Sequence, residues 1–420
     1  MLTPEQTALV KGSLPALRAH GETITSLFYA SLLRAHPDLH NMFNSANQAN
    51  GRQPRALLSV ILAYAAQPNH MSELVPRLER VCNKHCSLGV TPDQYDVVGE
   101  YLLQAFGVVL GAAWTPKLQA AWERSYALLA RMLIGRETHL YGEFGEWKTW
   151  RFFRIKDKVS EAEDFFSFHL VPSDGKPLPE FIPGQYVSVR IDVPSIGYLQ
   201  SRQYSLSEAP RKDYYRISVK RDRGVQAGKG IEAFQLKPGL VSNLLIDKFN
   251  VGDAIAVSHP AGGFNFDSEL SGTGPLVFIS AGSGATPLVS ILNTVLERGD
   301  DRPLSWIHCS SRSKPPFEEH IRQAAASRRS GSPFSVRFLR SQLADLVEYR
   351  SGTARGEGLR MDMERIERET LHLDHGAAEY FICGPEAFTQ DMIKLLVGQG
   401  VNRRRVKHEW FTTGDLEFKD

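Results

Sequence analysis

Apolar residues recur at helical spacing through the first third of the chain. They return every three or four positions in residues 27–33 and again in residues 57–62, which is the period of an amphipathic helix. Thr-Pro pairs at Thr3, Thr91 and Thr115 place a capping side chain just before a proline, an arrangement typical of a first helical turn. The pattern predicts an all-α unit of six or seven helices over residues 1–147.

After Trp150 the hydrophobic period changes to two. The segments FRIKDKVS, FFSFHLVP, QYVSVRID and YYRISVKR alternate apolar with polar residues and are rich in Val, Ile, Phe and Tyr. Glycine and proline residues flank these segments, as they commonly flank β-strands. Short strands at this spacing predict an antiparallel β-barrel over residues 148–268.

From residue 269 strands alternate with helices. The apolar runs PLVFISA, LSWIHCS, FSVRFLR and EYFICG are separated by longer segments, and a helix is predicted from Pro287. Parallel strands joined by crossover helices give this order. We therefore expect a multidomain chain that ends in an α/β parallel-sheet domain over residues 269–420.

Composition agrees with three globular units and excludes several function classes. The chain has 420 residues, and one domain takes about 150. Lys and Arg number 49 against 47 Asp and Glu, so a general nucleic-acid or membrane-surface binder is not expected. Four cysteines make no disulfide framework in a chain of this length, which favours a reducing compartment.

No integral membrane segment is expected. The most apolar stretch, residues 101–114, contains Gln104 and is shorter than the roughly 20 residues that cross a bilayer, so a buried helix is the simpler interpretation. The N-terminus lacks the charged-then-apolar order of a secretory signal. These features predict a cytoplasmic protein.

Two glycine-containing turns follow strands of the α/β part. The sequence AGSGATP joins a strand to a helix, and CGP follows the last predicted strand. Glycines let a phosphate approach the backbone, and a helix N-terminus adds partial positive charge. An ordinary tight turn would explain either motif alone, whereas both at one sheet edge favour a dinucleotide site. Its residues would be Gly282, Ser283, Gly284, Ala285, Thr286, Pro287, Cys383, Gly384 and Pro385.

The barrel carries a second group of candidate binding residues. Arginine can hold a pyrophosphate in a bidentate manner, tyrosine can flank a planar ring, and serine can hydrogen-bond a ring nitrogen. Most tyrosines in strands have only a packing role. The motif R-x-Y-S at residues 202–205, followed later by G-x-G-x-T-P at residues 282–287, is a much rarer combination. Residues 150–420 resemble the ferredoxin–NADP reductase superfamily, which has a flavin-binding barrel and a nicotinamide-binding domain. The resemblance implies that FAD is bound by Tyr186, Arg202, Gln203, Tyr204 and Ser205, with the terminal Glu409, Trp410 and Phe411 against the flavin ring.

The helical unit offers His85, in a Lys-His pair, as a candidate metal ligand. A single helical histidine is usually structural, and the chain has 13 histidines. A zinc site with Cys82 and Cys86 is an alternative, but no second ligand pair is apparent, and the cysteines are better explained as packing residues. The surrounding segments NMFNSANQANGRQ and QYDVVGEYLL, together with the fused reductase, make essentially the whole chain similar to the flavohemoglobin family. The globin residues that carry this similarity are Tyr29, Phe43, Gln53, Leu57, His85, Tyr95 and Glu137.

The resemblance implies that His85 binds the iron of haem b on its proximal side. Tyr95 and Glu137 would lie near His85, where a carboxylate accepting the second ring proton gives the ligand imidazolate character. The alternatives are a packing role for Tyr95 and a solvated position for Glu137.

On the other side of the haem, the resemblance assigns Tyr29 and Gln53 to bound dioxygen, where a hydroxyl donor stabilises developing negative charge. Phe43 would wedge the porphyrin and Leu57 would cap the distal pocket. Lys84 would pair with a haem propionate or with the flavin domain, although an exposed lysine is commonly just solvated.

The activity implied by the resemblance is that of a nitric oxide dioxygenase. NAD(P)H would reduce FAD, FAD would reduce haem, and haem-bound dioxygen would oxidise nitric oxide to nitrate, with no obligatory protein partner and a monomeric state. An oxygen store or sensor would need no reductase, and a diaphorase would deliver electrons elsewhere. Arg312 could meet the 2′-phosphate of NADPH or lie solvated in a loop, so NADH and NADPH both stay open. Residues 224–239 exceed a minimal hairpin, and no role is assigned to them.

Overall fold

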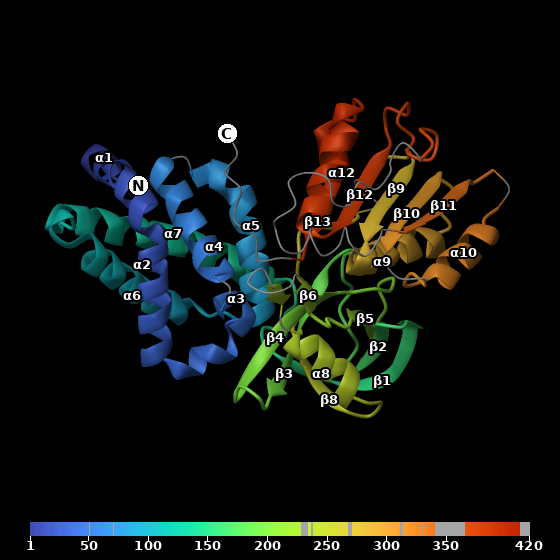
Figure 1. The fold of residues 1–420 in the computed structure, drawn as a ribbon, viewed down its shortest axis with the longest axis horizontal. Coiled ribbons are helices and arrows are strands. Elements are labelled where there is room, and N and C mark those ends of the chain that lie inside the picture. Colours follow the sequence, from blue (N-terminus) through green and yellow to red (C-terminus); the bar gives the residue numbers. More distant parts are fainter. Residues whose placement is uncertain are drawn as a thin grey trace.

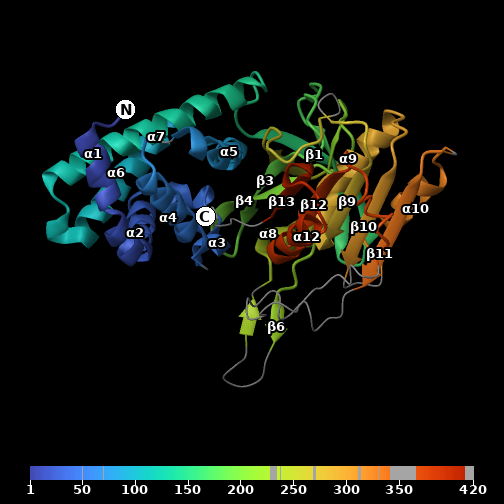
Figure 2. The same ribbon diagram turned by 90° about the horizontal axis from the view of Figure 1, so that it is seen from above.

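The computed structural model describes residues 1–49, 51–69, 71–227, 234–236, 238–267, 271–310, 314–329, 331–340 and 366–411. Three modules follow one another along the chain (Figure 1). The helical module lies at one side, and the barrel and α/β modules lie at the other. A view at right angles shows α7 (Pro116–Gly142) extending from the helical module toward the barrel (Figure 2).

Three helices of the helical module begin where the sequence places a capping threonine before a proline. Thr3 and Thr91 form capping boxes ahead of α1 and α6, and the Thr115 side chain accepts from the Leu118 N–H ahead of α7. The described α-helices of this module are α1 (Pro4–Gly12), α2 (Leu14–Ala35), α3 (Ser45–Ala49), α4 (Arg52–Ala66), α5 (Met71–Leu88), α6 (Pro92–Leu110) and α7, with short 3₁₀ turns η1 (Pro37–Asn41) and η2 (Gly111–Ala113).

Helix α6 and the turn after it, residues Pro92–Ala113, are long and apolar enough to cross a membrane by length and composition alone. In this structure α6 packs against α2 and α7. Its Leu102 and Phe106 are buried in the core that the three helices share. These contacts account for the buried part of α6, which is 22% of its most apolar 18-residue window.

The barrel module is a six-stranded antiparallel sheet in the order β4-β3-β8-β1-β2-β5. An antiparallel bridge between Leu206 and Ile217 joins its two edges. Its elements are β1 (Arg151–Ala162), β2 (Phe165–Pro172), β3 (Tyr186–Val193), β4 (Tyr198–Ser205), β5 (Tyr215–Lys220), α8 (Leu240–Lys248) and β8 (Ala254–Val257). The short strands β6 (Val225–Ala227) and β7 (Phe234–Leu236) pair as a hairpin within the segment that received no role.

The α/β module has a parallel sheet in the order β11-β10-β9-β12-β13. Helices α9 and α10 pack on one face and α12 packs on the other. Helix α9 begins at Ala285, so Pro287 lies in its first turn instead of at its start. The elements are β9 (Leu276–Ala281), α9 (Ala285–Glu297), β10 (Leu304–Ser310), α10 (Glu318–Ala326), β11 (Phe334–Arg340), β12 (Glu379–Gly384), α12 (Glu386–Gly398) and β13 (Val406–Trp410).

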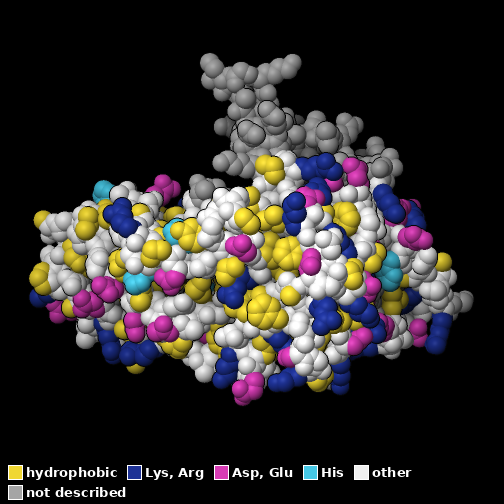
Figure 3. Space-filling view, turned by 90° about the horizontal axis from the view of Figure 1, so that it is seen from below, with side chains coloured by type: hydrophobic (Ala, Val, Ile, Leu, Met, Phe, Trp, Pro, Cys, Tyr) yellow, Lys and Arg dark blue, Asp and Glu magenta, His cyan; other side chains and the backbone are white. Residues whose placement is uncertain are grey.

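These three architectures confirm the predicted fold class. Positive and negative side chains are interspersed on the face in Figure 3, in keeping with a formal charge of +2. The predicted boundaries at residues 147/148 and 268/269 stay predictions, and residue 268 lies outside the described residues.

Candidate functional site

A cavity of about 470 Å³ lies within the helical module, a size suited to a small-molecule ligand or cofactor. Its walls come mainly from α2, α4, α5, α6 and α7, and Ser201 and Gln203 of the barrel strand β4 complete them. The helical-module residues predicted from the sequence that line it are Tyr29, Phe43, Gln53, Leu57, Lys84, His85 and Tyr95.

His85 has a defined tautomer in the cavity wall. Its Nδ1 lies 2.9 Å from Glu137 Oε1 and 2.9 Å from the Tyr95 hydroxyl. The Tyr95 hydroxyl in turn donates to Glu137 Oε1 at 2.6 Å. Because an ionised carboxylate can only accept hydrogen bonds, Nδ1 carries the ring proton and Nε2 keeps its lone pair. This donor set fits a haem iron, for which a neutral imidazole is a common ligand.

Glu137 is positioned by α7, and its side chain is only 4% exposed. Burial, followed by the nearby Glu137 charge, raises the pKa of the Tyr95 hydroxyl, so this hydroxyl stays protonated and remains a donor. The Tyr126 hydroxyl donates to the Tyr95 carbonyl at 2.5 Å, and the Cys86 thiol donates to the Glu137 carbonyl at 3.7 Å. Three helices therefore hold the carboxylate behind His85.

The cysteines on α5 behave as packing residues. Cys82 and Cys86 are buried and free of disulfides. Burial raises the pKa of the Cys82 thiol to about 12 and that of the Cys86 thiol further, which disfavours the thiolate that zinc requires. Within the described part of the chain, no three metal-binding side chains gather as a cluster.

Tyr29 and Gln53 face the cavity from α2 and α4. Burial raises the pKa of the Tyr29 hydroxyl, while a hydrogen bond with Gln53 partly opposes that rise. The Tyr29 ring meets the Phe43 ring edge to face at 5.6 Å between centroids. Tyr29 thus presents a protonated hydroxyl in a mostly apolar chamber, with Leu57 also in its wall.

Lys84 lies between the cavity and the barrel. Burial lowers the pKa of its ammonium group to about 8, with a further contribution from the charges of Arg80 and Arg202. A bound anion between these cations would offset their repulsion. Lys84 also lines the cavity, and its pairing with a haem propionate or with the flavin domain stays a prediction.

The predicted flavin residues lie on two paired strands of the barrel. Tyr186 of β3 is opposite Ser205 of β4. Two residues before Ser205, Gln203 is opposite Ser188 of β3, and its Nε2 donates to Ser188 Oγ at 3.1 Å. Burial raises the pKa of the Tyr186 and Tyr204 hydroxyls. Tyr186, Ser205 and Gln203 therefore share one face of this strand pair. Arg202 and Tyr204 alternate with them and lie on the other face, opposite Val189 and Val187.

The end of β13 reaches the same region from the α/β module. Glu409 is opposite Cys383 in the parallel register, and its charge acts on Tyr186. Burial raises the pKa of the Glu409 carboxyl, whose side chain is 18% exposed. Trp410 is opposite Gly384. Phe411, the last described residue here, is 45% exposed.

The two predicted glycine turns abut at the carboxyl edge of the parallel sheet. Gly282 has φ +55°, a backbone conformation that favours glycine. A Cβ on Gly284 would collide with the backbone of Cys383 and Gly384. β10 and β12 flank β9 on opposite sides, so the turns mark the point where the strand order reverses and where such sheets bind ligands. Arg312 lies outside the described residues.

Three polar residues of α5 form contacts between modules that the sequence motifs do not predict. Arg80 Nη2 donates to the Trp410 carbonyl at 2.6 Å, Asn83 Oδ1 accepts from the Gly262 N–H at 2.8 Å, and Ser87 Oγ accepts from Ser188 Oγ at 2.9 Å. These residues recur at helical spacing, and that stripe is the signal that could have found them. It places one face of α5 on the reductase modules while His85 faces the cavity.

Comparisons with known proteins agree with this arrangement. Residues 26–133 match the family described as Globin, residues 153–266 match the oxidoreductase FAD-binding domain, and residues 278–394 match the oxidoreductase NAD-binding domain. These families confirm the predicted cofactors: haem, FAD and a nicotinamide dinucleotide.

Similar proteins match the chain over nearly its full length. A flavohemoprotein of Bordetella parapertussis is 40% identical over 99% of this chain and 100% of its own, and one of Bacillus subtilis is 36% identical over 98% of both. A crystal structure of flavohemoglobin from Malassezia yamatoensis with bound FAD and heme covers 98% of this chain and 100% of its own, with a TM-score of 0.78 and 26% identity. The FAD/NAD-binding domain of a nitric oxide dioxygenase from Vibrio cholerae covers 62% of this chain and 98% of its own, with a TM-score of 0.50 and 28% identity. The chain belongs to the flavohemoprotein family.

Proposed function

We propose that the chain is a nitric oxide dioxygenase driven by NADH or NADPH. When bound, the nicotinamide and FAD supply electrons, and the haem iron is the place where dioxygen and nitric oxide combine to give nitrate. The Vibrio cholerae protein that resembles the reductase part is called a nitric oxide dioxygenase. Family membership and the three joined modules support the proposal.

The observation that carries it is the buried carboxylate behind His85. An oxygen store needs only a neutral imidazole whose N–H can rest on a backbone carbonyl. Here the Nδ1 atom lies 2.9 Å from Glu137 Oε1, so the ring carries more negative charge and is a stronger donor at Nε2. A donor of that kind favours charge transfer to dioxygen over simple storage.

On the opposite wall, Tyr29 supplies a proton donor to the cavity. Because burial raises the pKa of its hydroxyl, the group is a neutral donor throughout the physiological range. A donor fixed in an apolar chamber stabilises developing negative charge more effectively than water does. The Gln53 side chain hydrogen-bonds the Tyr29 hydroxyl, so the two predicted distal residues are in contact.

Anaerobic reduction of the purified holoprotein tests the proposal. NADH or NADPH should shift the Soret band to that of ferrous haem, and nitric oxide added with dioxygen should then be consumed with formation of nitrate. Flavin reduction without haem reduction would instead indicate a diaphorase. Haem reduction without nitrate formation would contradict the dioxygenase.

The nicotinamide preference is a separate question. We propose that Arg312 allows NADPH to be used alongside NADH. Steady-state kinetics with each cofactor before and after Arg312→Ala would decide, since an unchanged NADPH response removes the role of this residue. Cytoplasmic location and a monomeric state stay predictions from the sequence.

A further inference from the structure

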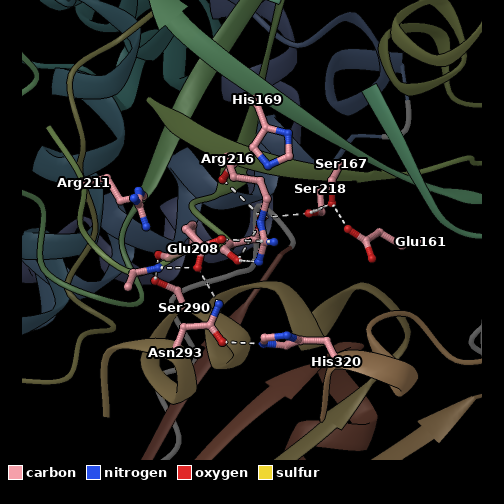
Figure 4. A network of polar contacts seen from close by, with 12 residues as sticks. Glu161, Ser167, His169, Glu208, Arg211, Arg216, Ser218, Ser290, Asn293 and His320 are labelled. Atoms are coloured by element: carbon pink, nitrogen blue, oxygen red, sulfur yellow. Dashed lines mark hydrogen bonds and ion pairs between the residues drawn. The ribbon is translucent and has the colours of Figure 1, made fainter. Parts of the chain in front are cut away.

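A buried polar network joins the barrel module to the α/β module at Glu208 (Figure 4). Glu208 Oε1 accepts from Asn293 Nδ2 of α9 at 2.5 Å, and the Glu208 carbonyl accepts from Ser290 Oγ of the same helix at 2.7 Å. Glu208 Oε2 lies 3.2 Å from Arg216 Nη1 of β5. The side chains of Glu208 and Arg216 are only 14% and 12% exposed, so this ion pair is largely shielded from water.

The Asn293 amide has a fixed orientation. His320 Nε2 of α10 lies 2.7 Å from Asn293 Oδ1, and burial lowers the pKa of the imidazole. A neutral imidazole with its proton on Nε2 donates to Oδ1, which leaves the amide N–H groups directed at Glu208. The amide therefore cannot rotate without losing both partners.

On the barrel side, Arg216 holds the loop that contains Glu208. Its Nε donates to the Ser207 carbonyl at 3.0 Å, and its Nη2 donates to the same oxygen. The Ser207 and Ser218 hydroxyls are 2.7 Å apart. Removing one partner from such a network leaves a buried charge or donor without compensation, which disturbs the packing around it.

The network connects the two predicted cofactor motifs through short segments of the chain. Glu208 lies three residues after Ser205 of the flavin motif in the sequence. Asn293 lies on α9, the helix that begins just after the Gly282–Gly284 turn. Glu208 thus links the strand that would hold the flavin to the helix whose N-terminus would hold the dinucleotide.

We propose that Glu208, through Asn293, is a positioning residue for hydride transfer from NAD(P)H to FAD. In this step a hydride leaves the nicotinamide, which is oxidised, and the same two electrons reduce FAD. Misplacement of reacting groups by about 1 Å can slow a reaction on the order of 100-fold. The position of α9 relative to β4 therefore governs the rate of hydride transfer. The inference rests on the proposed function in that NAD(P)H reduces FAD in this chain.

A second contact between the same modules supplies a matched control. Arg211 and Glu297, at the far end of α9, approach to 3.9 Å with 40% and 54% of their side chains exposed. An exposed pair of this kind contributes little. Glu297→Gln should therefore leave the placement of α9 unchanged.

The proposal is tested by anaerobic stopped-flow reduction of the holoprotein. The reductant is NADH or NADPH, whichever reduces the parent protein faster. Glu208→Gln and Asn293→Ala should each slow FAD reduction at saturating cofactor about tenfold or more. The long-wavelength charge-transfer absorbance between nicotinamide and flavin should weaken. A deuterium at the transferred position should give a larger isotope effect. In the cofactor-free proteins, amide hydrogen exchange along α9 should be faster in Glu208→Gln and in Asn293→Ala than in the parent. The control Glu297→Gln should match the parent in every measurement.

FAD reduction at the parental rate in Asn293→Ala would overturn the proposal. So would slower reduction with unchanged exchange in α9, because the helix would then be in its original place. Asn293→Ala keeps the Glu208–Arg216 pair, so it decides the matter if Glu208→Gln fails to fold. This experiment contains no nitric oxide and measures only flavin reduction. If the parent reduces FAD here but forms no nitrate in the separate nitric oxide assay, only the dioxygenase proposal is contradicted.

Discussion

His85, the proposed iron ligand, and His308 of the α/β module differ in the groups that contact the Nδ1 side of the ring. His85 has its Nδ1 proton directed to a carboxylate that is 4% exposed, and three helices hold that carboxylate. By contrast His308, on β10, has Nδ1 2.8 Å from Ser280 Oγ, and its buried Nε2 has no hydrogen-bond partner among the described residues. The arrangement at His85 makes Nε2 a strong electron-pair donor to a metal. The arrangement at His308 makes protonation of the imidazole costly.

Glu137→Gln keeps the shape of the carboxylate and removes its charge. A hydrogen bond to a charged group exceeds a neutral one by about 1–1.5 kcal/mol, so turnover should fall roughly tenfold. Haem should be retained, the iron–histidine stretching frequency should fall, and dioxygen affinity should change much less. Glu143, which follows α7, is 46% exposed, and Glu143→Gln is the control. Parental nitrate production together with a parental stretching frequency in Glu137→Gln would show that His85 alone suffices.

Tyr29→Phe removes a single hydroxyl from the cavity wall. A hydrogen bond to a charged acceptor contributes about 1.5–3 kcal/mol, so dioxygen should dissociate from the ferrous protein about tenfold faster or more. Haem content should stay at the parental level, because Phe fills the same volume against Phe43. Dissociation measured by flash photolysis at the parental rate would exclude Tyr29 as the donor.

His308 predicts an acid-sensitive α/β module. Burial, with the nearby Lys220 charge, lowers the pKa of the imidazole from 6.5 to about 3. Between these values the unfolded chain binds the proton and the folded chain does not, so the free energy of unfolding falls as pH drops below about 6.5. From about pH 7 to about pH 5 this group should cost about 2 kcal/mol.

Urea unfolding at both pH values checks that expectation. His308→Gln should lose less stability on acidification than the parent, by about the same 2 kcal/mol. His20 is exposed, and His20→Gln should behave as the parent does. Equal acid sensitivity in His308→Gln and the parent would rule out His308 as its source.

At the scale of elements, the turn between β9 and α9 carries a strict backbone requirement. Gly284 packs directly on the end of β12, so one turn braces the other. A side chain there would push the two strand ends apart, at the edge where a dinucleotide is expected.

Gly284→Ala should therefore destabilise the protein by about 1–3 kcal/mol, as overpacking does, and weaken NAD(P)H binding about tenfold or more. Gly398 ends α12, and nothing lies within 4 Å of the place that a Cβ would take there, so Gly398→Ala should be neutral or stabilising by up to about 1 kcal/mol. Thermal unfolding and titration with NAD(P)H measure both effects. Parental NAD(P)H affinity in Gly284→Ala would contradict the turn's role in binding.

At the scale of the molecule, strand β4 joins the three modules. Gln200, 1% exposed, accepts from the Ser45 N–H and hydroxyl at 3.0 Å each and donates to the Phe43 carbonyl at 3.3 Å. Gln203, on the same strand, lines the cavity of the helical module. One strand thus contacts the cavity, the predicted flavin site and, through Glu208 beyond its end, helix α9.

Gln200→Leu should uncouple the helical module from the barrel. Each buried backbone group left without a partner costs about 1–3 kcal/mol, so the start of α3 at Ser45 should shift. Electron transfer from FAD to haem should slow about tenfold, while NAD(P)H should reduce FAD at the parental rate. Stopped-flow absorbance at the flavin and Soret bands separates these steps. The exposed Gln119 on α7 gives the control Gln119→Leu, and equal slowing of both steps in Gln200→Leu would contradict an interface role.

The order and type of the three modules were predictable from sequence because they depend on local periodicity. A proline after a capping threonine favours the start of a helix, as at Thr91. Alternation of apolar residues is set by the pleat of a strand and needs no distant partner. The two glycine turns could also be placed at one sheet edge, because all parallel strands present their carboxyl ends there. The identities of the haem and flavin residues came from family resemblance, which carries tertiary information that the pattern alone lacks.

Tertiary structure alone decided which polar side chains meet. Arg80 of α5 and Gln200 of β4 are ordinary polar positions in the sequence, yet each contacts a different module. Glu208 and Asn293 lie far apart along the chain, and their side chains are 2.5 Å apart in space. A polar residue on an amphipathic element has the same periodicity whether it faces water or a neighbouring module. Only the packing of one module on another removes the water, and this desolvation is what turns such residues into specific contacts.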